Sequence, residues 1–239
     1  MDIKTLFETY KILVSNKIGS KEIFEKSGMV DKSKILDFGF FPLGSGILTE
    51  TKSEIKKAAI EENGTLILGN DFGTITYLET KCKNNREKNS KTIDNLLKLE
   101  LNLETTFFTN FYLGLRNDQK HLGTTMTKRV VKLQQDYKDL CNNFFDVQLS
   151  MLEPRTIICL GSDVGQTLSE YSKLFKTLSK KYSTISNLYA DENKKEYIVN
   201  IDDNQYGKRK FILIPHPSFG HINWKKNYIE EKIKAALQN

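Results

Sequence analysis

Three polar side chains that could act together in catalysis each lie at the end of an apolar run in this 239-residue sequence. They are Asp71, Asn110 and His216, which offer a carboxylate, an amide that both donates and accepts hydrogen bonds, and an imidazole. Each residue type is usually structural when it occurs alone. If the runs are parallel strands, however, their carboxyl ends meet at one edge of a sheet, where open α/β folds bind ligands. Their joint placement therefore predicts a functional site.

The spacing of apolar residues predicts an alternation of strands and helices. Strands are predicted near 35–41, 66–69, 105–112, 156–160, 197–201 and 210–214. Helices are predicted near 2–17, 20–27, 52–62, 130–151, 163–178 and from about 223 onward. The polar run 81–91 contains five basic residues and is predicted to be a mobile surface loop. The alternation favours an α/β fold with a largely parallel sheet covered on both faces.

The composition is that of an ordinary globular protein, with 38% apolar and 28% charged residues. We expect one domain over 1–239, with an N-terminal helical segment at about 1–34. A charged N-terminus and the lack of a long apolar run predict a cytoplasmic protein with no membrane partner, and we expect a monomer. Three scattered cysteines indicate reduced thiols, with no disulfide framework and no metal site. A net charge of +6 favours a polyanionic partner, although a lysine-rich solvated surface gives the same excess.

Two motifs at the predicted strand ends resemble those of the uracil-DNA glycosylase superfamily. Gly69-Asn70-Asp71-Phe72-Gly73-Thr74 is similar to its Gly-x-x-x-Gly or Gly-Gln-Asp-Pro-Tyr-His strand-turn motif, and His216-Pro217-Ser218-Phe219-Gly220-His221 to its late His-Pro-Ser motif. Between them, Phe108-Thr109-Asn110-Phe111 looks like the strand whose Asn reads the base. The stretch from Cys141 to Gly161 has the family's order of helix, proline, strand and glycine. The resemblance covers roughly residues 35–235.

This resemblance implies a three-layer α/β/α sandwich with a mainly parallel four-stranded sheet. The implied activity is hydrolysis of the bond between deoxyribose and a flipped uracil, or another damaged or modified base, in single- or double-stranded DNA. Asp71 would position water and stabilise the cationic sugar, and His216 would hydrogen-bond the base carbonyl oxygen. Asn110 would pair with the edge of the base. The iron–sulfur branch of the superfamily needs four cysteines, so no cluster or other cofactor is expected.

The resemblance assigns weaker roles to residues around these three. Phe72 or Tyr77 would stack on the base, and Gly73 stands where the uracil-specific branch has a tyrosine, which leaves room for a 5-substituted pyrimidine. Core packing is the alternative for Phe72. Contacts with the DNA are expected from Ser218 and the backbone after it, from an apolar wedge, and from basic residues near the motif. The residues concerned are Ser218, Phe219, His221, Ile222, Lys208 and Arg209.

Two other functions fit the same residues. One is a DNA-binding protein of this fold that has lost turnover and acts in repair or defence, which the altered first motif permits. The other is an enzyme acting on free nucleosides or nucleotides. Retention of Asp71 and His216 favours an enzyme, and binding that requires polymeric DNA and weakens steeply with salt would count against the nucleoside enzyme.

Overall fold

The structure is a computed structural model, and it describes part of the chain. The described residues are 5, 9, 12, 20–30, 64–71, 73–74, 85–101, 106–116, 134–179, 185–190, 195–203, 207–219, 224 and 228–238, without the side chains at 20–22, 30, 85–90, 115, 179, 186–187, 203 and 219. The predicted strand at 35–41 and helix at 52–62 lie outside these ranges. Within the predicted helix at 2–17, the described residues 5, 9 and 12 are helical.

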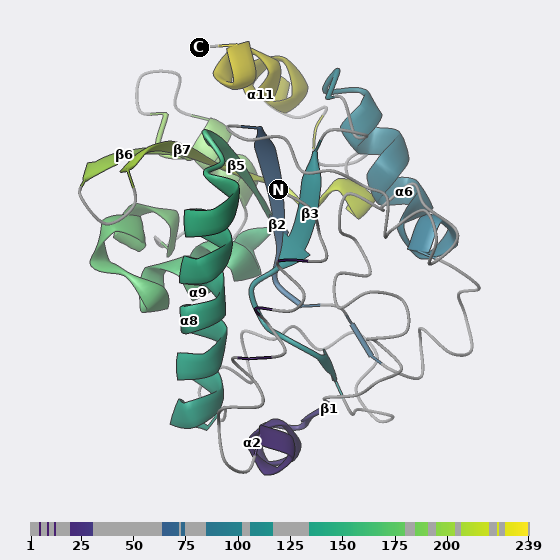
Figure 1. Cartoon of the computed structure of the whole chain (residues 1–239). Coiled ribbons are helices and arrows are strands. Elements are labelled where there is room, and N and C mark those ends of the chain that lie inside the picture. Colours follow the sequence, from purple (N-terminus) through teal and green to yellow (C-terminus); the bar gives the residue numbers. More distant parts are fainter. Residues whose placement is uncertain are drawn as a thin grey trace.

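A five-stranded sheet forms the centre of the described fold (Figure 1). Its strands are β2 (Thr65–Gly69), β3 (Phe107–Asn110), β5 (Thr156–Leu160), β6 (Ile198–Asp203) and β7 (Gly207–Ile214). They lie in the order β3-β2-β5-β7-β6, and every neighbouring pair is parallel except β6 with β7. The mainly parallel sheet is thus confirmed, but the expected count of four strands is wrong, because the β6–β7 hairpin adds an antiparallel edge strand.

The register of the parallel strands aligns their carboxyl ends. Gly69 at the end of β2 lies opposite Asn110 at the end of β3. On the other side of β2, β5 pairs with β7 so that Leu160 lies opposite Ile214. The residues that follow β2, β5 and β7 therefore emerge at the same edge of the sheet as Asn110.

Helices cover both faces of the sheet, as predicted. On one face lie α8 (Gln135–Leu152) and α9 (Ser162–Tyr171), whose Phe145 and Tyr171 rings contact Phe111 just after β3 (Figure 1). The helix α11 (Ile229–Gln238) lies on the other face, where the side chain of Lys210 donates to a carbonyl of this helix. Because side chains alternate along a strand, Lys210 and its buried neighbour Phe211 point to opposite faces.

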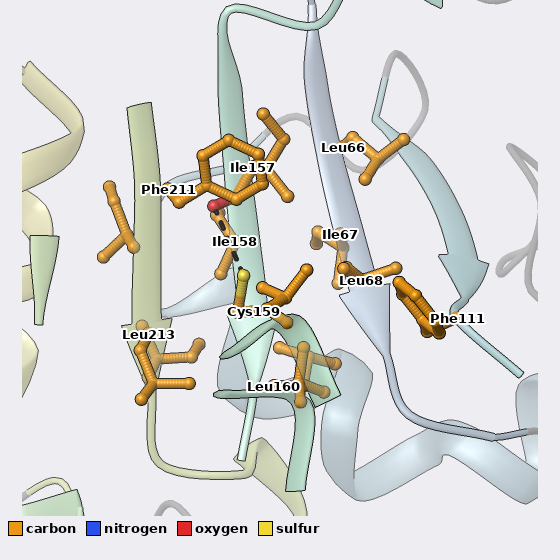
Figure 2. Packing of buried hydrophobic residues seen from close by; sticks show 14 of the residues in the cluster. Leu66, Ile67, Leu68, Phe111, Ile157, Ile158, Cys159, Leu160, Phe211 and Leu213 are labelled. Carbon is orange, nitrogen blue, oxygen red and sulfur yellow. Dashed lines mark hydrogen bonds between the residues drawn. The ribbon is translucent and has the colours of Figure 1, made fainter. Parts of the chain in front are cut away.

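The sheet is hydrophobic because its central strands are buried on both faces. Leu66, Ile67 and Leu68 of β2 are each at most 1% exposed, and Ile157 and Ile158 of β5 are fully buried. Figure 2 shows these side chains packed with those of β7. Strands buried on both sides have continuous apolar runs rather than an alternation, and this is the pattern that predicted them. Cys141 and Cys159 lie in this core as buried free thiols.

A second, two-stranded sheet lies beside the main one. Its strands β1 (Met29–Val30) and β4 (Leu115–Arg116) are antiparallel. The strand β1 follows the helix α2 (Ser20–Lys26) in the chain. The predicted helix at 20–27 is thereby confirmed. Phe24 of α2 is buried and meets the ring of Tyr137 edge to face, which attaches this N-terminal segment to α8.

Three other predicted elements need correction. Most of the predicted loop at 81–91 is helical, since α6 spans Asn85–Leu97; its first turns are polar, and its apolar anchors come late, at Ile93 and Leu96. The predicted helix 163–178 stops at Tyr171 because Ser172 is extended, and a 3-10 helix at Lys173–Ser179 continues the buried face. The last helix begins at Ile229 rather than near 223, because Tyr228 has a left-handed φ of 51°.

The contact of α9 with the 3-10 helix that follows it yields a prediction about Gly165. A Cβ atom at Gly165 would lie 2.6 Å from the backbone carbonyl oxygen of Leu178. Ala ordinarily stabilises a helix relative to Gly by about 1 kcal/mol, but here overpacking reverses the sign. We expect Gly165→Ala to lower the free energy of unfolding by about 1–3 kcal/mol in urea titrations. Ser150→Ala, at an exposed position of α8, is the control and should change it by less than about 0.5 kcal/mol. A Gly165→Ala variant more stable than wild type would contradict this packing.

Candidate functional site

Four adjacent parallel strands deliver polar residues to the carboxyl edge of the sheet. Asn110 ends β3, Asp71 follows β2, Gly161 and Asp163 follow β5, and His216 follows β7. Asp71 and His216 come from strands separated by β5. The carboxylate of Asp71 nevertheless raises the pKa of His216. The structure thus places the three residues that the sequence singled out at one edge of the sheet.

The loop after β2 continues to pair with the segment after β3, and this holds Asp71. The amides of Phe111 and Tyr112 donate to the carbonyl oxygens of Gly69 and Asn70 at 3.0 and 2.9 Å. Further on, the amide of Arg116 donates to Gly73 at 2.8 Å. The two segments therefore run side by side beyond the sheet, with Asp71 between their points of contact.

One oxygen of the Asp71 carboxylate accepts two hydrogen bonds. Its Oδ1 atom lies 2.8 Å from the backbone nitrogen of Gly73 and 3.0 Å from Nε of Arg116. The side chains of Arg116 and Asp71 are 13% and 11% exposed. Sequence reasoning did not identify Arg116, because the two residues are 45 positions apart and no local pattern connects them.

The carboxamide of Asn110 is buried with an unused donor. Asn110 is 2% exposed, and its Nδ2 atom has no hydrogen-bond partner among the described residues. Leaving a buried polar group unsatisfied costs about 1–3 kcal/mol, so the donor is suited to a ligand or a water molecule. The side chain lies over Gly69, where a Cβ atom would be 2.0 Å from Asn110 Oδ1. Glycine at 69 therefore provides the space that Asn110 occupies.

Asn70, next to Asp71, anchors the same loop to α9. Its Oδ1 atom accepts a hydrogen bond of 2.8 Å from the Thr167 hydroxyl. Burial raises the pKa of Tyr112, and a hydrogen bond with Thr167 opposes that rise. The Asn70 Nδ2 atom is a second buried donor without a partner among the described residues. Asn70, Thr167 and Tyr112 support the site from the α8–α9 face, and sequence reasoning gave them no role.

His216 is fixed by its own loop in a defined tautomer. The backbone amide of Ser218 donates to His216 Nδ1 at 3.2 Å, and the Ser218 hydroxyl lies 2.7 Å from the same nitrogen. Because Nδ1 accepts from an amide, the proton of the neutral ring is on Nε2. The ring packs against Gly161, where a Cβ atom would lie 3.5 Å from His216 Cβ. This geometry leaves Nε2–H as the donor that His216 can offer to a ligand.

Opposing influences set the charge of His216. Desolvation lowers the pKa of the imidazole, although His216 is an exposed residue, whereas the carboxylates of Asp163 and Asp71 raise it. Desolvation is the larger influence, so the pKa of His216 is lowered and the neutral ring is favoured. Asp163 lies in the first turn of α9, and its carboxylate raises the pKa of His216.

The other predicted site residues are distributed unevenly. Ser218 lies beside His216, and Gly73 has a φ of 87° in the Asp71 loop. Lys208 and Arg209 lie at the opposite end of β7 from His216, and Arg209 donates to the backbone oxygen of Leu149 at 2.8 Å, so they are not brought to the site. The structure does not describe the remaining predicted site residues, which are Phe72, Tyr77, His221, Ile222 and the side chain of Phe219.

The described residues hold neither a cluster of metal-ligand side chains nor a membrane-spanning helix. No group of three or more His, Cys, Asp or Glu side chains in the described part gathers as metal ligands would. Among the described helices, none has the length and apolar composition needed to cross a bilayer.

No protein-family model matches this chain, and no curated protein matches it significantly.

The contact between Gly69 and Asn110 can be tested by a double-mutant cycle. Gly69→Ala should lower the free energy of unfolding by about 1–3 kcal/mol, because the new Cβ atom displaces the Asn110 carboxamide. In the Asn110→Ala background the same change should cost much less, since the atom that it would strike is gone. Urea titrations of the wild type, both single variants and the double variant measure this coupling. Additive effects would contradict the contact.

The charges near His216 predict how its titration midpoint differs between wild type and two variants. Imidazole NMR signals, assigned with His216→Gln, should give a midpoint below 6.5 for wild type. Asp163→Asn should lower the midpoint further, and Asp71→Asn should lower it by less, because each removes a carboxylate that favours the imidazolium. Since the folded form resists protonation, stability should decrease as the pH falls from 6.5 through the folded midpoint. Asp202→Asn, on the exposed edge strand, is the control and should leave the midpoint unchanged. A midpoint above 6.5 would show that the carboxylates dominate.

Proposed function

We propose that the protein is a DNA glycosylase, which hydrolyses the bond between deoxyribose and an extruded uracil or other altered base. The observation on which the proposal chiefly rests is that Asp71 and His216 lie at the same edge of the sheet, where the Asp71 carboxylate raises the pKa of the imidazole. Asn110 adds a buried donor on the neighbouring strand. The sequence resemblance to the uracil-DNA glycosylase superfamily supports the same reaction.

The reaction requires the two kinds of group that this edge offers. Breaking the bond moves its electron pair to the base and leaves a cationic sugar, so the transition state needs an anion near the sugar and donors near the base. Asp71 is the anion, and it also orients the water whose oxygen bonds to the sugar carbon. That water gives up one proton, and the departing base anion takes up a proton. No metal is needed for these steps.

The leaving base would be stabilised by His216 and Asn110. A neutral imidazole with its proton on Nε2 donates a hydrogen bond to a carbonyl oxygen of the base as negative charge develops there. The Asn110 Nδ2 donor would gain the partner that it lacks in the free protein. A base without an acceptor at that position would leave this donor unsatisfied and would be rejected. The roles of anion and donor are thus divided between different residues.

A DNA-binding protein without turnover is the second candidate, and one observation favours it. The Arg116 guanidinium is paired with Asp71 at 3.0 Å and offsets part of the negative charge that a cationic sugar would require. Such a protein would keep the fold and the excess of basic residues, which give the chain a net charge of +6. Measured base release decides between the two candidates.

The activity test uses single- and double-stranded oligonucleotides that carry uracil, hypoxanthine or 5-modified pyrimidines. Base release is read as strand breakage at abasic sites after alkali treatment. We expect wild type to release at least one of these bases, and Asp71→Asn to be slower by about 10²–10⁴-fold because the water and the sugar cation lose their carboxylate.

Asp202→Asn is the matched control, because it makes the same chemical change at an exposed residue of β6, and it should retain wild-type activity. Tight DNA binding without base release would favour the non-catalytic protein. Release from free nucleosides but not from DNA would favour the nucleoside enzyme. An Asp71→Asn variant as active as wild type would show that Asp71 does not have the assigned role.

A further inference from the structure

We propose that Arg116 is the positioning residue of this site, fixing the Asp71 carboxylate so that its Oδ2 atom faces the reacting water and sugar. The inference rests on the proposed function, and it assigns a role to a residue that no sequence motif singled out. Arg116 would act through Asp71, without touching the substrate itself.

Two hydrogen bonds orient the Asp71 carboxylate. Both donors, Gly73 N–H at 2.8 Å and Arg116 Nε at 3.0 Å, meet the same oxygen, Oδ1. No described residue donates a hydrogen bond to Oδ2. Two donors on one oxygen restrict the rotation of the carboxylate about its bond to Cβ. Oδ1 is therefore the structural oxygen, and Oδ2 is the one left for chemistry.

The backbone of Arg116 is itself held on two sides. On one side, its amide donates to the Gly73 carbonyl oxygen at 2.8 Å, and the residue forms an isolated parallel bridge with Thr74. On the other side, β4 pairs with β1, with Arg116 opposite Met29. The guanidinium therefore starts from a backbone that is already tied to the Asp71 loop. Such a scaffold suits a group that has to hold a catalytic carboxylate in a fixed orientation.

The burial of the pair argues against a mobile Arg116 that leaves Asp71 to bind DNA. Its side chain is 13% exposed, and that of Asp71 is 11% exposed. Moving Arg116 away would leave the largely buried Asp71 carboxylate without its ion pair. A phosphate-binding arginine is expected at an exposed position, where it can reach the DNA backbone.

The positive charge of Arg116 cannot by itself explain how this residue would help the reaction. A positive charge near Asp71 opposes the cationic sugar, so its electrostatic effect on the reaction is unfavourable. Its benefit must come from geometry, since the planar guanidinium presents Nε–H in a fixed direction, whereas the lysine ammonium is a flexible point charge. Displacing a catalytic group by about 1 Å can cost about 10²-fold in rate.

The test measures single-turnover base release and DNA affinity for wild type, Arg116→Lys, Arg116→Met and Asp71→Asn, and for Arg116→Met combined with Asp71→Asn. We expect both Arg116 variants to lower the rate by about 10–100-fold with the affinity for DNA unchanged. In the Asp71→Asn background, Arg116→Met should cause little further loss, because the two residues act as one unit. Thermal unfolding checks that each variant is folded. Arg116→Lys keeps the charge and serves as the second variant if Arg116→Met does not fold.

Three results would overturn the proposal. An Arg116 variant that weakens DNA binding, reduces its salt dependence and leaves the rate intact would identify a phosphate contact instead. Wild-type rates in both variants, or an equal loss with and without the Asp71 carboxylate, would show that Arg116 does not act through Asp71. In these cases wild type is active, so the proposed function stands. If wild type itself releases no base, the proposed function fails, and the positioning role fails with it.

Discussion

The parallel pairing of β2 with β3 on one side and with β5 on the other is the constraint on which the candidate site depends. Buried apolar residues fix the register of these strands, because a shift by one residue would turn every side chain to the other face. This register sets Gly69 beside Asn110, where the missing side chain makes room for the carboxamide. The packing of the buried apolar residues thereby determines where the Asn110 carboxamide lies.

Beyond the sheet, backbone hydrogen bonds take over the positioning of the site. The segments after β2 and β3 remain paired through residues 69–74 and 110–116, and this pairing delivers Arg116 to Asp71. Three backbone hydrogen bonds therefore tie the loop that carries Asp71 to the segment after β3. Strand β1 pairs in turn with β4, which includes Arg116. The described α2–β1 segment therefore supports the candidate site through its pairing with β4.

The sequence predicted elements well where burial is complete and boundaries are sharp. The strand at 156–160 agrees with β5, because an apolar run lies between Pro154 and Gly161. The sequence did not predict α6 as a helix, because the first turns of this helix are polar and its apolar residues come late. Arg116 and Asp163 escaped notice because their partners are distant in sequence and are brought near only by the fold. The prediction that Lys208 and Arg209 lie at the site was wrong because both residues are at the beginning of β7, whereas the site is at the end of this eight-residue strand.

The electrostatics of the site explain why His216 suits a donor better than a proton carrier. Two carboxylates favour the imidazolium, and desolvation outweighs them. If the carboxylates dominated, a cation at His216 would pair with Asp71 and cancel the charge meant for the sugar. A neutral ring avoids this competition and still offers Nε2–H, because Ser218 occupies Nδ1. On the proposed mechanism, the desolvation of one imidazole thus keeps the negative charge of Asp71 available for the cationic transition state.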